Sequence, residues 1–459
     1  MRVFKFTLLS LYVFLFCSRT YAYDCEVDGI YYNRISATEA EVTYKAYNKD
    51  NNCYINDYIG NIIVPETITY NGKTLIVRAI GKYAFHYCEN LTSIVLPNSI
   101  TIIDDFAFAG CHNLSSITLS SNLVSLGEQS LFGVAIDSIT FPEGFTTIGY
   151  YAIGTSQPLV VNFPKSIRKI GESAFVTTVK EVHFPDLNTL LNIDEGKKNV
   201  YGDGNCGYIT IPVVDSSTRE LHNTFDLYID NKLLTDLIIP DTITKIRSWA
   251  FTGCKSLTSV IIPNSVDTIG VAAFMSCPNL REIKFPEGLK EIGSYSNTAL
   301  KTVTIPNNVE WLWFFENCQE LDTVIIGSGV NKIYGGCFKN SRPMKAVYCL
   351  ASVPPKMDLY VKSNGTILDG YLSSFDDYQF TWTDLYVPKG CKEVYQNSLW
   401  GKFMSINEFD PSTLSVMNPR IKNEEMSRYS ITGCKISNHV KGVNIIKMSD
   451  GTTKKIIEK

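Results

Sequence analysis

The residues that could carry out chemistry in this chain are few and stand far apart. The five histidines among its 459 residues are His86, His112, His183, His222 and His439. None has the H-E-x-x-H spacing or another spacing typical of metal ligands, so we expect no metal ion and no cofactor. Glu181 lies two residues before His183, but no G-x-S-x-G nucleophile turn accompanies the pair. The sequence therefore predicts no catalytic residues.

A glycine-rich stretch and scattered carboxylates are weaker signals for chemistry. Residues 202–207 have the sequence GDGNCG, which matches the G-x-G-x-x-G pattern of dinucleotide-binding loops. That loop needs a helix after it, whereas YITIPVV at 208–214 is a strand pattern, so we predict a turn. Two carboxylates that meet only in space would suffice for a glycoside hydrolase, and a glycan- or peptide-acting hydrolase stays our third functional hypothesis.

The thirteen cysteines follow a pattern that is structural in origin. Five of them lie three residues after a phenylalanine, namely Cys88, Cys111, Cys254, Cys277 and Cys318. Because a repeat determines this position, we predict that each thiol is a small buried side chain. Disulfides between neighbouring repeats are the alternative, and Cys349 with Cys391 is one candidate pair.

The same spacing extends over most of the chain as an internal repeat. Ile80 and Ile103 open nearly identical segments 23 residues apart, and Ile246, Ile269 and Ile292 repeat that interval twice. Periods of about 20–30 residues are typical of solenoids, in which one unit is too small to bury its own apolar face. Successive units must therefore share one apolar core.

Each repeat predicts one short strand and one return segment. The pattern L-x-x-I-x-L-P, as in Leu91, Ile94 and Leu96, alternates inward and outward positions, and the proline ends the hydrogen-bonding ladder. The pattern Ile-Gly-x-x-Ala-Phe then predicts a short helical or irregular return path with its Ile, Ala and Phe directed inward. We expect the phenylalanines of this pattern, such as Phe85 and Phe108, to be buried.

The complete motif, I-G-x-x-A-F-x-x-C-x-x-L-x-x-I-x-L-P, resembles the BspA-like leucine-rich repeats of surface proteins. The resemblance extends from Ile62 to about Asp410. It implies a repeat solenoid: a leucine-rich-repeat array, mostly β, with short parallel strands and short helical or irregular return segments. It also implies a secreted or cell-surface protein that acts in adhesion. Ile153 and Ser296 stand where the motif has Phe, and Gly327 stands where it has Pro.

The first 22 residues have the pattern of a secretory signal peptide. Arg2 and Lys5 precede an apolar run of about a dozen residues, and TYA at 20–22 is a small-residue cleavage site. The run is too short for a transmembrane helix, and we expect no transmembrane segment. We therefore expect a mature chain from residue 23, either outer membrane-associated at the cell surface or extracellular. A lipid anchor on Cys17 is the less favoured alternative.

Composition and repeat boundaries divide the rest of the chain into seven segments. We predict an N-terminal β cap at 23–79, repeats at 80–186, an insertion at 187–233, repeats at 234–345, a C-terminal cap at 346–410, a linker at 411–428 and a small hairpin module at 429–459. Within the insertion, IDNKLL predicts a tight turn between two strands, after which the chain re-enters the solenoid.

The C-terminal module combines short alternating strands with an Asp450-Gly451 turn. It is similar to the C-terminal sorting modules of type IX secretion, and this similarity implies a role in export and surface attachment. A stabilising hairpin without a sorting role is the alternative.

The outward residues of the expected strands predict a ligand-binding surface on the concave face of the solenoid. The surface is rich in Ser and Thr, which suit polar contacts to a protein or glycan but are also ordinary exposed strand residues. The candidate residues are Ser93, Val95, Ser116, Thr118, Ser138, Thr140, Glu181, His183, Ser259, Ile261, Glu282, Lys284, Thr302, Thr304, Thr323 and Ile325.

Charge restricts the class of partner. The chain has a net charge of −4 at pH 7 and no basic stripe before its lysine-rich end, which disfavours nucleic acid. We expect an extracellular protein or glycan ligand, presented by host matrix, other cells or surface glycans. A structural spacer or stalk of the cell surface is the second hypothesis.

Overall fold

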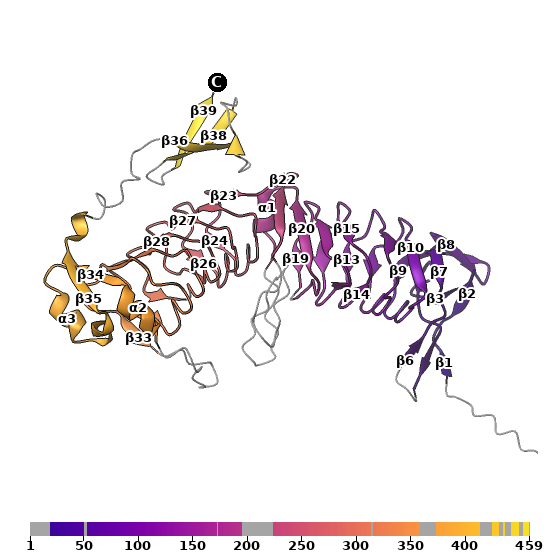
Figure 1. Cartoon of the computed structure of the whole chain (residues 1–459). Coiled ribbons are helices and arrows are strands. Elements are labelled where there is room, and N and C mark those ends of the chain that lie inside the picture. The colour runs from indigo at the N-terminus through magenta and orange to yellow at the C-terminus, as the bar shows by residue number, and fades with distance from the viewer. Residues whose placement is uncertain are drawn as a thin grey trace, which may run out of the picture.

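The protein is an elongated array of coils with a small separate sheet at its C-terminus (Figure 1). Parallel strands stack along the array, which confirms the predicted solenoid. The computed structural model describes residues 19–49, 53–171, 173–194, 224–313, 315–358, 373–413, 425–430, 435–436, 442–448 and 453–458.

The first strand of each coil follows the predicted alternation. In β10, Leu91 and Ile94 are buried while Thr92 and Val95 are exposed, and Pro97 follows the strand. Neighbouring coils pair these strands in parallel. We call them the main strands: β7 (Gly60–Ile63), β10 (Leu91–Val95), β12 (Ser116–Thr118), β15 (Ser138–Thr140), β18 (Leu159–Asn162), β20 (Val179–Phe184), β21 (Asp226–Ile229), β23 (Asp236–Ile238), β25 (Ser259–Ile261), β27 (Glu282–Lys284), β28 (Thr302–Thr304), β30 (Thr323–Ile326), β32 (Ala346–Cys349), β34 (Asp384–Pro388) and β35 (Ser405–Phe409).

The coils contain a second short strand, which ends at or near the Ile of the Ile-Gly pattern. The sequence predicted a helical or irregular return segment there, not a strand. The chain then turns at a residue with positive φ, such as Tyr83 or Trp249. Glycine follows the Ile because successive coils approach closely here: a Cβ on Gly149 would lie 2.5 Å from the carbonyl carbon of Gly127. The second strands are β9 (Lys73–Ile80), β11 (Ile102–Ile103), β13 (Ser125–Leu126), β16 (Thr147–Ile148), β19 (Lys169–Ile170), β24 (Lys245–Ile246), β26 (Thr268–Ile269), β29 (Trp311–Leu312), β31 (Lys332–Tyr334) and β33 (Lys356–Asp358), and two coils add β14 (Leu131–Val134) and β17 (Ile153–Thr155).

The phenylalanines of the repeat stack on one another from coil to coil. The ring centroids of Phe85 and Phe108 are 4.9 Å apart, and those of Phe251 and Phe274 are 5.3 Å apart. All four side chains are buried in one continuous core. The predicted sharing of an apolar interior is therefore confirmed.

Two departures from the motif have different outcomes. Ile153 occupies the Phe position and is buried. Ser296 does not occupy that position, because the ring of Tyr295 lies there instead, 6.0 Å from the ring of Phe274 and 5.3 Å from that of Phe315. In this coil the aromatic side chain is therefore displaced by one residue relative to the motif.

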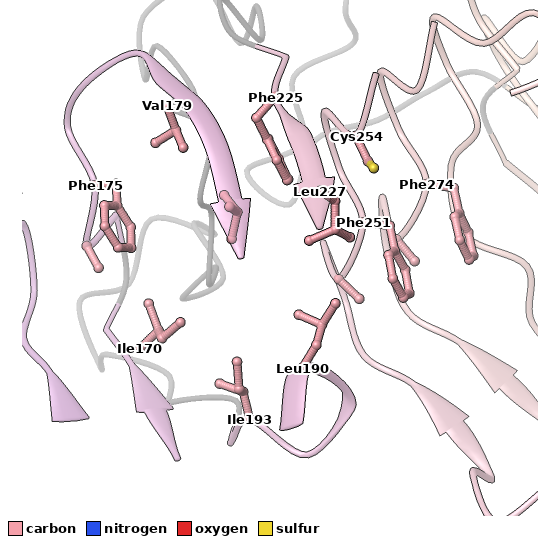
Figure 2. Close-up of a cluster of buried hydrophobic side chains, with 14 of the residues drawn as sticks. Ile170, Phe175, Val179, Leu190, Ile193, Phe225, Leu227, Phe251, Cys254 and Phe274 are labelled. Carbon is pink, nitrogen blue, oxygen red and sulfur yellow. The ribbon is translucent and has the colours of Figure 1, made fainter. Parts of the chain in front are cut away.

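The two blocks of repeats share their core across the predicted insertion. Figure 2 shows Leu190 and Phe225 between the coil of Phe175 and that of Phe251. Leu190 belongs to α1 (Leu187–Leu191). β21 pairs in parallel with β20, so the end of the insertion re-enters the solenoid as predicted.

The predicted turn in IDNKLL is confirmed. β21 pairs antiparallel with β22 (Lys232–Leu233), and Asp230 and Asn231 between them have φ values of 52° and 57°. Residues 195–223, with the predicted GDGNCG turn and His222, lie outside the described residues.

Strands of two sheets form the N-terminal end of the array: the end of the nine-stranded sheet that contains the second strands of the first block, and a separate three-stranded sheet. β4 pairs in parallel with β9, and β3, β2 and β8 extend that sheet. β1 and β6 flank β5 in a second sheet, and β1 lies within the predicted signal peptide, so cleavage after residue 22 would remove it. The bounds are β1 (Arg19–Tyr21), β2 (Cys25–Val27), β3 (Ile30–Arg34), β4 (Glu39–Val42), β5 (Ala46–Asn48), β6 (Cys53–Ile55) and β8 (Thr67–Tyr70).

Short helices close the other end of the array. Trp400 is buried there, and its Nε1 donates a 2.8 Å hydrogen bond to the carbonyl of Pro355. The helices are α2 (Asp377–Trp382), α3 (Lys392–Gln396), and the 3-10 helices η1 (Leu399–Lys402) and η2 (Pro411–Thr413).

The C-terminal module is a four-stranded antiparallel sheet, larger than the predicted hairpin. Its strand order is β37-β36-β38-β39. β38 and β39 pair as predicted on either side of the Asp450-Gly451 turn, which itself lies outside the described residues. β36 starts inside the segment predicted as a linker. The strands are β36 (Glu425–Ser430), β37 (Lys435–Ile436), β38 (Gly442–Met448) and β39 (Thr453–Glu458).

Candidate ligand-binding face

The outward side chains of the main strands form two rows along the solenoid. Parallel register places Ser93 opposite Ser116 and Val95 opposite Thr118, and the same relation holds within each sheet. We call this surface the strand face. Its first row is Asn61, Ser93, Ser116, Ser138, Val160, Glu181, Asp226, Asp236, Ser259, Glu282, Thr302, Thr323, Ala346, Asp384 and Ser405, and its second row is Ile63, Val95, Thr118, Thr140, Asn162, His183, Tyr228, Ile238, Ile261, Lys284, Thr304, Ile325, Tyr348, Tyr386 and Asn407.

All sixteen residues predicted for the binding surface lie in these two rows. Fourteen of them are exposed or half-buried. Ser259 and Ile261 are the exceptions, with only 7% and 5% of their surface accessible. The prediction that these two are exposed is wrong: Tyr429 of the C-terminal sheet packs on Ile261, and Ser259, on the same face of β25, donates a hydrogen bond to the carboxylate of Asp236. A strand pattern contains no information about a segment that folds back from elsewhere.

The first part of the strand face is hydroxyl- and amide-rich. The hydroxyl of Ser93 donates a 2.7 Å hydrogen bond to Oδ1 of Asn61, and Nδ2 of Asn162 donates a 3.1 Å bond to the hydroxyl of Thr140. Asn162 lies opposite His183 in the second row but was not predicted. The alternation of Leu159, Val161 and Phe163 before a proline was the available signal.

The middle of the strand face holds a charged and aromatic group. Nε2 of His183 lies 3.3 Å from Oε2 of Glu181, and the His183 ring stacks on that of Tyr228 with centroids 4.3 Å apart. Nζ of Lys180 lies 3.1 Å from Oε1 of Glu181. The hydrogen bond from Lys180 is the largest cause that holds the pKa of Glu181 below its ordinary value, partial burial opposes it, and His183 adds to it. This group can present a fixed negative charge and a flat ring to a ligand.

The second block carries an apolar patch on the strand face. Ile238 and Ile261 lie opposite each other in the register of β23 and β25. Tyr429 of the C-terminal sheet is buried against both, and Ile445 packs at the side of the cluster. The hydroxyl of Ser259, in the neighbouring row, donates to the carboxylate of Asp236.

The last coils add an aromatic section that the sequence analysis missed. The rings of Tyr348 and Tyr386 stack with centroids 4.6 Å apart, and Phe409 meets Tyr348 edge-on at 5.3 Å. Burial raises the pKa of Tyr348, and the neighbouring Tyr386 adds to the shift. The segment was predicted as a cap, although the alternation in DLYVP and AVYC indicates further main strands. Half-buried tyrosines of this kind provide flat apolar surface with a polar edge.

The repeat cysteines lie in the core and interact with the preceding coil. The thiol of Cys111 donates to the carbonyl of Phe85 at 3.0 Å, and burial raises the pKa of Cys254 to about 11. All ten cysteines in the described part of the chain are free thiols, including Cys349 and Cys391, so that candidate disulfide is not formed. The prediction of small buried side chains is confirmed for the five repeat cysteines.

Metal-ligand clusters and membrane-spanning helices are both absent from the described residues. No group of three or more His, Cys, Asp and Glu residues is placed there to hold a metal ion. No helix within the same residues is both long and apolar enough to cross a membrane.

The repeat identifies the family. A model of the BspA type leucine rich repeat region matches residues 78–196 and 226–345, with six copies. The chain belongs to this family. The matched residues cover both blocks of repeats, and hence most of the strand face of this BspA-type protein.

The chain is similar to several solved structures, and the first named here shows the same fold. The pneumococcal vaccine antigen PcpA is 17% identical, with a TM-score of 0.50 over 84% of this chain and 98% of its own. A leucine rich cell surface protein from Faecalibacterium prausnitzii A2-165 is 22% identical over 71% and 94%, with a TM-score of 0.43. A leucine-rich repeat protein from Bacteroides ovatus ATCC 8483 is 22% identical over 73% and 99%, with a TM-score of 0.38. At these identities the likeness concerns the fold alone. No curated protein matches the chain.

Proposed function

We propose that this BspA-type protein is exported and binds an extracellular protein or glycan through the strand face. The single observation that carries the proposal is the parallel register, which aligns outward side chains of successive coils into two long rows. The pattern of residues 1–22 supports export. A surface of this extent can bind through many individually weak contacts, as extended repeat surfaces do.

The chemistry of the rows suits a polar ligand with some apolar surface. Hydroxyls at Thr302 and Thr304 donate and accept hydrogen bonds, and Glu282 and Lys284 next to them add both signs of charge. The stacked tyrosines of β32 and β34 add apolar area to the same surface. Protein interfaces and glycan sites both combine such groups.

A capture experiment with matched variants tests the proposal. The mature chain from residue 23 is immobilised and screened against matrix proteins and a glycan array. We expect the triple variant Glu282→Ala, Thr302→Ala, Thr304→Ala to lose capture of any ligand that the native chain binds. The control is Glu287→Ala, Thr242→Ala, Thr244→Ala, which changes the same residue types at positions in the turns beyond the main strands. Equal capture by both variants would place the site elsewhere.

The continuous core favours a second candidate function, that of a rigid spacer of the cell surface. Among the described residues, a single apolar cluster contains side chains from Ile30 to Ile406. A spacer needs this rigidity and no ligand, so a native chain that captures nothing in the screen supports it. A hydrolase, the third hypothesis, would require turnover of a captured glycan or peptide that a single carboxylate substitution abolishes.

A further inference from the structure

The C-terminal sheet contacts the strand face through a cluster that is separate from the core of the array. Tyr429 on β36 packs against Ile238 and Ile261, and Ile445 on β38 adjoins them. None of these four side chains belongs to the core shared by the coils. Figure 1 shows the sheet beside β23, with the rest of the solenoid extending to either side.

Ile238 and Ile261 occupy positions where the strand face is otherwise exposed. In the same row, Lys284 on the next main strand is exposed, as are Thr118 and Thr140 in the first block. Two adjacent isoleucines at outward positions would form a small apolar patch if nothing covered them. Such a patch on a surface marks a contact site.

The charges of the two partners are of opposite sign. Residues 425–459 contain seven Lys and Arg against three Asp and Glu, although the whole chain has a net charge of −4. On the array, Asp236 and Glu282 flank Ser259 in the first row, and Lys284 lies opposite Ile261 in the second. On the tail, Arg428 is buried next to Tyr429. The tail, a segment of net positive charge, therefore brings the aromatic side chain of Tyr429 to a patch next to the carboxylates of Asp236 and Glu282.

The contact has the features of a reversible one. In the described residues the tail strands pair only with one another, so no strand of the array holds them by a backbone ladder. The apolar part involves two isoleucines of the array, whereas each coil buries a full set of core side chains against its neighbours. A contact this small depends on the covalent connection between the tail and the array, which keeps the local concentration of the tail high.

We propose that the C-terminal sheet is a releasable cover of the ligand site of the second block. The site is the patch at Ile238 and Ile261 between the carboxylates of Asp236 and Glu282. Its ligand is a protein segment of net positive charge with an exposed aromatic side chain, the chemistry that the tail and its Tyr429 supply from within the chain. This inference rests on the proposed function of the strand face. Ligand and tail then compete for one surface, and release of the tail opens it.

Thiol labelling tests the cover without a ligand. Ser259→Cys and Thr302→Cys are introduced separately into the mature chain and treated with a maleimide, and peptide mass spectrometry follows each site apart from the native cysteines. Ser259 is buried on the same face of β25 as Ile261, on which Tyr429 of the tail packs, and Thr302 is exposed in the same row as Ser259. With the tail closed most of the time, we expect labelling of Ser259→Cys to be about tenfold slower than that of Thr302→Cys.

A second substitution then opens the cover. Ile238→Lys places a charge against Tyr429 but lies outside the core of the coils, so the array should stay folded. We expect it to raise the labelling rate of Ser259→Cys to that of Thr302→Cys. Val95→Lys, an exposed position in the same row of the first block, is the matched control and should leave the rate unchanged. Raising the salt concentration to about 1 M should also speed labelling, because it screens opposite charges.

Two results would overturn the proposal. One is equal labelling of Ser259→Cys and Thr302→Cys in the otherwise native chain. The other is slow labelling of Ser259→Cys that persists with Ile238→Lys and after proteolytic removal of the tail at a site inserted in 414–424. A third outcome separates the two parts of the proposal. If Ile238→Lys opens the cover but does not increase capture in the ligand screen, the tail is a cover but the patch is not a ligand site.

Discussion

The Sγ atom of Cys277 lies 3.1 Å from the carbonyl oxygen of Phe251, one coil earlier in the array. The hydroxyl of Ser341 makes the same contact with the carbonyl of Phe315 at 3.0 Å. The repeat therefore has a small hydrogen-bond donor at this position, which can be either the thiol of Cys or the hydroxyl of Ser. This contact joins neighbouring coils in addition to their apolar packing.

The first prediction concerns this donor. Cys277→Ser should leave the array more stable than Cys277→Ala, by about 1 kcal/mol, because Ser keeps a hydrogen bond to the carbonyl of Phe251. Urea denaturation followed by circular dichroism measures the difference. If the site were purely apolar, Cys277→Ala would be the more stable variant, because Ala buries no hydroxyl.

The second prediction concerns two buried tyrosines with different partners. The hydroxyl of Tyr295 is buried and has no hydrogen-bond partner among the described residues, whereas that of Tyr395 donates to the carbonyl of Ala351 at 2.8 Å. Tyr295→Phe should raise the midpoint of thermal unfolding, because it removes an unpaired polar group. Tyr395→Phe should lower it, at a cost of about 1 kcal/mol. A loss of stability in both variants would contradict this assignment.

The third prediction concerns the aromatic stack. Phe274→Asp should unfold the second block, because it places a charge inside the core shared with Phe251. Phe274→Leu should cost far less, since Leu131 is buried at the same position of its own coil. Val271→Asp is the control, because Val271 is exposed in the same turn. Limited proteolysis with mass spectrometry shows which block opens.

The fourth prediction concerns pH. The folded-state pKa of Glu181 is below its ordinary value of 4.5, with Lys180 as the largest cause. The stability that this carboxylate contributes is therefore present above the unfolded pKa and is lost as the pH falls through the folded pKa. Lys180→Met should raise the pKa of Glu181, as measured by carbon-13 NMR titration. Lys165→Met, a lysine that pairs with Asp186 instead, should leave it unchanged.

Much of the fold could be predicted because the core residues recur in the sequence at a regular interval, mostly of 22 or 23 residues. Phe85, Phe108, Phe251 and Phe274 are buried where the motif places them. Tyr295 was misplaced because a motif assigns positions by count, whereas a coil can shift by one residue if an aromatic ring still reaches the stack. The second strands were missed because two extended residues leave too little alternation to detect.

The outward rows of the strand face were predictable because burial on one side of a strand implies exposure on the other. The limit of this inference is visible at Ile261. Its neighbours in the strand are inward-facing core residues, and its own position is outward, yet it is buried by Tyr429 from a segment far along the chain. Contacts of this kind depend on tertiary folding that no local pattern contains.

The close contact between Gly149 and Gly127 has a consequence for how this protein can change its length over evolutionary time. Gly171 stands against Gly149 in the same way, since a Cβ on Gly171 would lie 2.6 Å from the carbonyl carbon of Gly149. The glycines therefore form a column in which each coil must place a glycine against the glycine of the coil before it. A one-residue insertion between two of them would drive a bulky neighbour into the column. Recombination that duplicates or deletes a whole coil leaves the column intact, so such arrays should grow and shrink in complete units.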